Sequence, residues 1–148
     1  MLSRKTSLTC FLRSYLLGAA FTPQGMQSLG MTHAIEPGLA KIYPNPEDML
    51  RARQRYIHHF NTHPFGAPFL LGLFLNLEQL VAQGVLPEGS LRNIKDTAGY
   101  TLSAIGDSVF SGTLIPFWVL ASACLLLLNM SWAALFFSLC LFVGFQVF

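Results

Sequence analysis

Charged residues are scarce in this chain and almost absent from its C-terminal third. Only 11% of the 148 residues are Asp, Glu, Lys or Arg, whereas a soluble domain usually carries about 25%. Beyond Asp96 the only charged residue is Asp107, and the rest of the sequence as far as Phe148 is largely apolar. A soluble core with an unusually apolar tail is the alternative, but this composition favours a membrane protein.

The sequence also lacks the patterns that mark metal sites, disulfide frameworks and catalytic centres. Cys10, Cys124 and Cys140 have the spacing of neither a metal site nor a disulfide framework. There is no Gly-rich phosphate loop and no Ser-His-Asp arrangement. We therefore expect no catalytic residue, no bound metal and no cofactor. The net charge of +2 is too small to indicate a nucleic-acid partner.

What positive charge there is lies in the N-terminal two thirds. Every Lys and Arg falls between Arg4 and Lys95, and this bias predicts that the N-terminal part faces the cytoplasm. A secretion signal is the alternative, because the chain begins with basic residues followed by an apolar stretch. However, Arg13 interrupts this stretch, and no cleavage site follows convincingly. Apolar residues at helical spacing favour an interfacial amphipathic helix within residues 1–20.

A second helix is predicted over residues 46–62, in the cytoplasm or at the membrane interface. Asn45 is suited to the N-cap and Pro46 to the first helical position. Arg55 is expected on the face turned to solvent or lipid headgroups. The helix should end before Pro64, because the residue before a proline is disfavoured in the α region.

The apolar stretch within residues 64–80 is too short for a simple transmembrane helix, which needs about 20 residues. Pro64, Gly66 and Pro68 make its start irregular. We predict a re-entrant or tilted, half-spanning segment that is buried against protein. Glu78 is expected to mark its interfacial end.

Two further apolar runs predict membrane helices at 103–128 and 132–148, with a short turn at Asn129. Small residues over 97–113 allow helices to pack closely, or alternatively form a broken backbone that lines a cavity. The fold class expected is therefore all-α, made of integral membrane helices.

Two polar clusters are candidates for binding. In the first, Asn61 and His63 offer donors and acceptors that suit sugar hydroxyls, or Asn61 simply closes the preceding helix. In the second, Asp107 is an ionisable residue at membrane depth, which is by default a functional-site hypothesis. Alternatively, Asp107 or Ser108 is the N-cap of the following helix.

Three motifs, in this order, resemble those of a known family. They are Met-Gln-x-Leu-Gly at 26–30, Phe-Asn-Thr-His-Pro at 60–64 and Ile-Gly-Asp-Ser-x-Phe-x-Gly-Thr at 105–113. Residues 21–148 resemble the IID component of the mannose/fructose/sorbose family of bacterial sugar phosphotransferase systems (PTS). Five further residues fit the resemblance: Ala34, Pro37, Tyr43, Glu78 and Lys95.

The resemblance implies a single IID-like domain over 1–148 in the bacterial cytoplasmic (inner) membrane, multi-pass and with a cytoplasmic N-terminus. Such a subunit forms a hetero-oligomer with a IIC membrane subunit, and together they translocate a hexose across the lipid bilayer. The soluble IIA and IIB proteins carry the phosphoryl group, so the IID chain itself is not an enzyme. On this basis the residues expected to line or support the sugar site are Asn61, His63, Asp107 and, more weakly, Gln27.

The sequence departs from the family pattern in places. Tyr100 and Thr101 replace a typical Gly-Pro, and Ile115 replaces a typical Arg, which predicts altered transport competence or a different sugar. We expect the chain to correspond to about the first half of a family member. A truncated remnant that only binds a partner subunit is therefore the alternative. A third hypothesis is a small peripheral enzyme with an apolar anchor.

Overall fold

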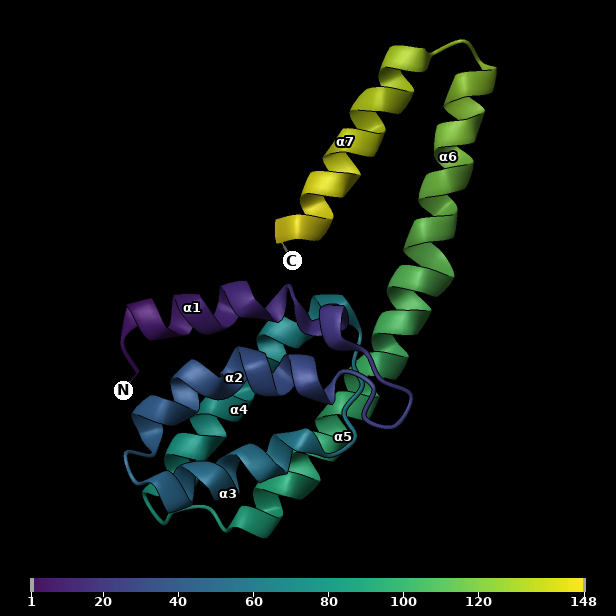
Figure 1. Ribbon diagram of the computed structural model, residues 1–148. Helices are drawn as coiled ribbons and strands as arrows, with labels where there is room; N and C mark the ends of the chain where they lie inside the picture. The colour runs from purple at the N-terminus through teal and green to yellow at the C-terminus, as the bar shows by residue number, and fades with distance from the viewer. Residues whose placement is uncertain (1, 148) are drawn as a thin grey trace. The chain divides into compact units, whose positions relative to one another are not determined.

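The computed structural model describes residues 2–147, and side chains as far as Val143. Helices make up most of the described chain, and its only β-type pairings are isolated bridges (Figure 1). The predicted all-α class is therefore confirmed. The chain divides into two compact units, Met1–Ser103 and Ala104–Phe148, which are described separately below.

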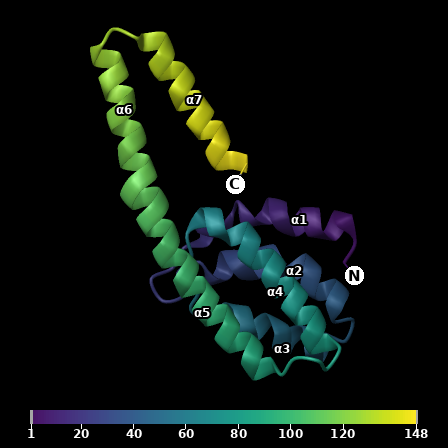
Figure 2. The same ribbon diagram turned by 180° about the vertical axis from the view of Figure 1, so that it is seen from behind.

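The first unit is a cluster of short helices. α1 packs against α2 and α4, and α2 also packs against α3 (Figure 2). The elements are α1 (Arg4–Ser14), η1 (Leu17–Ala20), α2 (Ser28–Ile42), α3 (Pro46–Ile57), η2 (Pro64–Gly66), α4 (Ala67–Ala82) and most of α5 (Glu88–Gly106).

Local sequence explains the start of α3, but the helix ends earlier than predicted. The Asn45 side chain accepts a hydrogen bond from the Glu47 amide and Pro46 occupies the first turn, so the predicted cap is confirmed. The helix stops at Ile57, not at residue 62, because His58 adopts an extended conformation with ψ 163°. The chain leaves the helix there to pair Phe60 with another loop.

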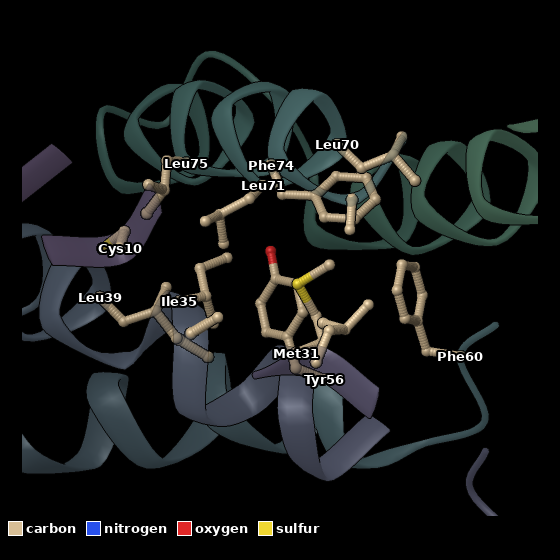
Figure 3. Packing of buried hydrophobic residues seen from close by; sticks show 14 residues of the cluster. Cys10, Met31, Ile35, Leu39, Tyr56, Phe60, Leu70, Leu71, Phe74 and Leu75 are labelled. Carbon is tan, nitrogen blue, oxygen red and sulfur yellow. The ribbon is translucent and has the colours of Figure 1, made fainter. Parts of the chain in front are cut away.

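The core of this unit lies between α2, α3 and α4. Met31, Ile35 and Leu39 recur every four residues along α2, so they form one buried stripe. They meet Tyr56 from α3 and a matching apolar face of α4 (Figure 3). The buried α4 residues labelled in the figure are Leu70, Leu71, Phe74 and Leu75. Removal of these side chains from water is the main force that holds the helices together.

Among the described residues, two helices are long and apolar enough to cross a membrane: Pro64–Ala82 and Glu88–Leu127. The second comprises α5, the π-helical segment η3 (Asp107–Leu114) and α6 (Ile115–Leu127). Within η3 the wider backbone spacing lets the Thr113 hydroxyl donate to the Ser108 carbonyl, five residues back, at 3.1 Å. The alternative of a broken backbone over 97–113 is therefore wrong, because helical hydrogen bonding continues through this stretch.

The second unit also contains α7 (Ser131–Val147), which packs against α6. The predicted turn between them is present, with Asn129 in the left-handed region at φ 58°. Side-chain hydrogen bonds link the two helices. The Trp118 indole donates to the Ser138 hydroxyl at 3.4 Å, and the Ser122 and Ser138 hydroxyls lie 3.3 Å apart.

Candidate functional site

The segment between α3 and η2 is held by backbone pairing with the loop that precedes α2. The Gln27 amide donates to the Phe60 carbonyl at 2.9 Å, and the Phe60 amide donates to the Gly25 carbonyl at 3.2 Å. Met26 makes this approach possible with a left-handed φ of 55°. Two of the three sequence motifs therefore meet in space, although 35 residues separate Gln27 from Thr62.

Gln27 positions this segment through its side chain as well. Its Oε1 accepts a hydrogen bond of 3.1 Å from the Thr62 amide, and both residues are buried. A buried amide N–H needs such a partner, because leaving it unpaired costs about 1–3 kcal/mol. The structure thus gives Gln27 a supporting role for the residues on either side of Thr62.

Asn61 faces α5. Its Nδ2 donates to the Ser103 hydroxyl at 3.3 Å. At Gly99 a Cβ atom would lie 3.1 Å from the Phe60 ring and 3.4 Å from the Asn61 carbonyl oxygen, so the absence of a side chain there lets α5 approach the segment closely. The predicted capping role for Asn61 is wrong, since α3 has already ended at Ile57 and His58 is its C-cap.

His63 is largely buried, with 8% of its surface exposed. It is the N-cap of η2, and its Nδ1 accepts a hydrogen bond from the Phe65 amide at 3.4 Å. An Nδ1 acceptor assigns the proton of the neutral ring to Nε2. Asn61 and His63 therefore flank Thr62 in a short extended segment that is fixed at both ends.

Asp107 belongs to the second unit, where it is the first residue of η3 and is exposed. It is not an N-cap, and neither is Ser108. The preceding residue, Gly106, is already helical, and no side chain caps η3. The capping interpretation fails because the helix runs through this point instead of beginning there. Single-turn π-helical insertions are frequent at functional sites.

A buried ion pair lies elsewhere in the first unit and corrects two expectations. Arg55 was expected on a solvated face and Glu78 at an interfacial end, yet they are 4% and 0% exposed. Arg55 Nη2 lies 2.5 Å from Glu78 Oε2, and its Nε donates to Oε1 at 3.1 Å. The physical reason is the two-point geometry of guanidinium and carboxylate, which lets the charges be buried together.

Tyr43, Tyr56 and Lys95 complete this network. The Tyr43 hydroxyl donates to Glu78 Oε2 at 2.8 Å, and Lys95 Nζ donates to the Arg55 carbonyl at 2.8 Å. Burial and the Glu78 carboxylate raise the pKa of both Tyr43 and Tyr56. Burial disfavours the charge of Arg55, but the contact with Glu78 outweighs it and raises the pKa of Arg55.

Sequence reasoning gave Tyr43 and Lys95 no role beyond their fit to the family resemblance, and it placed Arg55 and Glu78 wrongly. One signal was present: Arg55 follows Ala52 by three residues and precedes Tyr56, and the helical spacing puts it beside the apolar face.

The positions that depart from the family pattern are exposed. Tyr100 stacks on His59, with ring centroids 6.1 Å apart and an interplanar angle of 25°. Thr101 lies next to it on α5, and Ile115 is the first residue of α6.

The fixed polar segment at Asn61 and His63 thus leads directly into an apolar helix of membrane-spanning composition. The family model described as "PTS system mannose/fructose/sorbose family IID component" matches residues 1–148. The chain belongs to this family.

Similar proteins agree with that membership. The mannose-specific EIID component of Escherichia coli K12 is 36% identical over 108 residues, which cover 72% of this chain and 38% of that protein. The fructose permease IID component of Bacillus subtilis is 28% identical over 116 residues, covering 78% and 42% respectively.

A cryo-EM structure of the mannose transporter ManYZ in complex with microcin E492 contains a chain of the same fold. Its TM-score is 0.85 at 29% identity, and the match covers 99% of this chain and 53% of that one. The chain thus spans about half the length of the relatives it matches, or less.

Proposed function

We propose that this chain is the IID subunit of a sugar permease in the bacterial cytoplasmic membrane. With a IIC partner it binds a hexose and carries it across the bilayer, while IIA and IIB phosphorylate the sugar on the cytoplasmic side. The observation that carries the proposal is the fixed segment at Asn61 and His63 in a chain of the IID family. The mannose- and fructose-specific relatives support a hexose as the substrate.

The physical requirement is a set of polar groups that replaces the water around the sugar in a low-dielectric environment. Asn61 and His63 offer neutral donors and acceptors, and Asp107 can accept hydrogen bonds from two hydroxyl groups. Gln27 keeps the Asn61–His63 segment in place through Thr62. Phosphorylation makes the sugar anionic and so prevents its return. This division of labour leaves the chain itself a non-enzymatic subunit.

The alternative function is that of a non-transporting protein which only binds a partner subunit. Tyr100 and Ile115 favour it, because they replace residues typical of the family.

Sugar uptake tests the proposal. The chain is produced together with its IIC, IIA and IIB partners in cells that lack this uptake, and phosphoenolpyruvate-dependent hexose accumulation is measured. We expect accumulation, and a loss of about tenfold or more in Asp107→Asn and in His63→Ala, because hydrogen bonds that involve charged or buried groups contribute about 1.5–3 kcal/mol. The matched controls are Asp48→Asn and His59→Ala, which change side chains of the same types; Asp48 is partly exposed and His59 is exposed.

Co-purification with IIC distinguishes the remaining outcomes. Retained IIC binding without uptake supports the partner-binding alternative. If the chain shows no uptake and does not bind IIC, both functions are contradicted. An equal loss of uptake in the variants and in their controls contradicts the roles assigned to Asp107 and His63.

A further inference from the structure

A long groove runs along α1 in the first unit, between this helix and α4, and opens at the C-terminal end of α2. It consists of two adjoining pockets of about 640 Å³ and 480 Å³, which share Leu2 and Gln79 in their linings. Volumes of this size are typical of ligand sites. The groove lies apart from the Asn61–His63 segment, which lines neither pocket.

One part of the groove is apolar. Cys10, Leu71 and Leu75 form part of its lining and also belong to the buried core (Figure 3). Gly72 of α4 lies in the same lining, and a Cβ atom there would meet no other atom within 4 Å. Glycine inside a helix is unfavourable relative to alanine. Here it leaves the groove wide along the side of a helix that is apolar enough to span a membrane.

The other part is polar and positively charged. The Ser3 and Thr6 hydroxyls lie 2.9 Å apart at the start of α1, and Lys41 of α2 shares their pocket. Lys41 is exposed, and the ion pairs found among the described residues do not include it. No Asp or Glu appears in the lining of either pocket. This end therefore suits an anion.

The outer face of α1 indicates which anion this is. Leu8 and Leu12 are each more than half exposed, as is Leu16 just after the helix, while Arg4 and Lys5 begin the helix. A helix with a basic end and an unpartnered apolar face is typical of the membrane interface. A groove beside it, cationic at one end and apolar along the rest, matches a molecule with an anionic head and a hydrocarbon tail.

We propose that this groove binds one anionic phospholipid. Its phosphate contacts Lys41 and the Ser3 and Thr6 hydroxyls, and one acyl chain lies along α4 past Gly72. A free anion would leave the apolar part in water, and an uncharged detergent would leave Lys41 unneutralised. The site does not depend on sugar transport, so it stands or falls independently of the proposed function.

Lipid retention provides the test. The full chain is purified in a mild uncharged detergent and titrated with phosphatidylglycerol or phosphatidylcholine, and bound lipid is counted by native mass spectrometry. We expect one phosphatidylglycerol per chain, bound more tightly than phosphatidylcholine. Lys41→Gln should weaken phosphatidylglycerol binding by about tenfold, because it removes a charge-assisted contact. Lys5→Gln, which makes the same charge change outside the groove, should have little effect.

Gly72→Leu tests the apolar part separately. The new side chain enters open space, so the helical circular dichroism should be unchanged while lipid binding falls by at least tenfold. Gly89→Leu is the matched control, since a Cβ atom at that exposed glycine also meets no atom within 4 Å. Should Gly72→Leu fail to fold, the comparison of Lys41→Gln with Lys5→Gln decides the question.

Three outcomes would overturn the proposal. Equal binding of phosphatidylglycerol and phosphatidylcholine would show that the negative charge of the lipid is not recognised. Equal weakening by Lys41→Gln and Lys5→Gln shows unspecific attraction to a basic surface. Full lipid binding by a folded Gly72→Leu variant shows that the lipid lies elsewhere.

Discussion

The contact between Arg55 and Glu78 is made out of reach of water, and this determines how it responds to mutation. A buried ion pair adds little net stability, because removing both charges from water costs about as much as their attraction returns. Removing only one partner is different, since the other charge then remains buried without compensation. Arg55 has a second acidic neighbour, Glu88, at 3.2 Å, but that side chain is mostly exposed.

We predict that Glu78→Ala lowers the free energy of unfolding by about 3–5 kcal/mol. The matched control is Asp48→Ala, which breaks the exposed pair with Arg51 and should cost less than about 1 kcal/mol. Unfolding of the chain in mixed micelles, followed by circular dichroism, measures both. Equal effects in the two variants would show that burial of the pair is unimportant.

The raised pKa values of Tyr43 and Tyr56 predict that the stability of the folded chain depends on pH in the alkaline range. Their pKa values are raised in the folded protein, whereas an unfolded chain ionises tyrosine near pH 10. Above that pH the unfolded state loses protons that the folded state keeps, so the free energy of unfolding falls as pH rises. The slope between pH 9 and about 11.5 should be shallower in Tyr43→Phe than in the unmodified chain. Tyr15→Phe, at a tyrosine that is 55% exposed, is the control; identical slopes in all three proteins would contradict the assignment.

At the scale of helices, close packing depends on where glycine is placed. A Cβ atom at Gly30 of α2 would overlap the backbone carbonyl of Leu17 in η1, and backbone cannot move aside as a flexible side chain can. Gly72 of α4 has open space instead. The same substitution should therefore have opposite effects at the two positions.

We predict that Gly30→Ala destabilises the first unit by about 1–3 kcal/mol, the usual cost of overpacking. Gly72→Ala should stabilise it by about 0.5–1 kcal/mol, because alanine is favoured within a helix. Thermal unfolding monitored by circular dichroism shows whether each variant is more or less stable than the unmodified chain. A stabilising Gly30→Ala would mean that η1 does not pack against α2 as described.

Several helices could be predicted from the sequence, whereas α2, the helix ends and the helix contacts were not. The cap at Asn45 follows from local chemistry. No helix was predicted over residues 28–42, although the apolar stripe of α2 has helical spacing. The end of α3 at Ile57 depends on pairing between Phe60 and residues near Gly25, which are distant in sequence. Local pattern cannot contain that information. The predicted helix over 103–128 already contained Asp107, but local pattern left open whether a helix starts at this residue or passes through it, because small polar residues also suit a helix start.

In the candidate site, too, the residues could be selected from the sequence, but their contacts could not be predicted. Asn61, His63, Gln27 and Asp107 were selected by residue type and family resemblance, and the pairing that brings Gln27 to Thr62 required the fold. Arg55 was misplaced because helical spacing alone left it at the edge of the buried face, and only its distant partner Glu78 decides which side it takes.

At the scale of the whole chain, the distribution of charge predicts how it lies in a membrane. All the Lys and Arg residues precede Asp96, so the start of α3 should face the cytoplasm. The segment within residues 64–80 is predicted to be re-entrant, so Glu88–Leu127 is the single crossing between α3 and Asn129. The turn at Asn129 should therefore lie on the opposite side of the membrane.

We predict that, in a variant without native cysteines, Glu47→Cys reacts with a membrane-impermeant maleimide only after cells are opened. Asn129→Cys should react in intact cells. Extraction of membranes with carbonate should leave both proteins in the pellet. Labelling of both positions from the same side would contradict a single crossing between them, and reversed labelling would contradict the cytoplasmic assignment.

The Arg55–Glu78 pair also bears on synthesis. The two residues are 23 positions apart, so at about 5–20 residues per second the ribosome takes roughly one to five seconds to add Glu78 after Arg55. Neither charge has its partner until both residues have left the ribosome, and burying one charge alone is costly. We therefore expect α3 and α4 to dock together, so that Arg55 and Glu78 leave water as a pair.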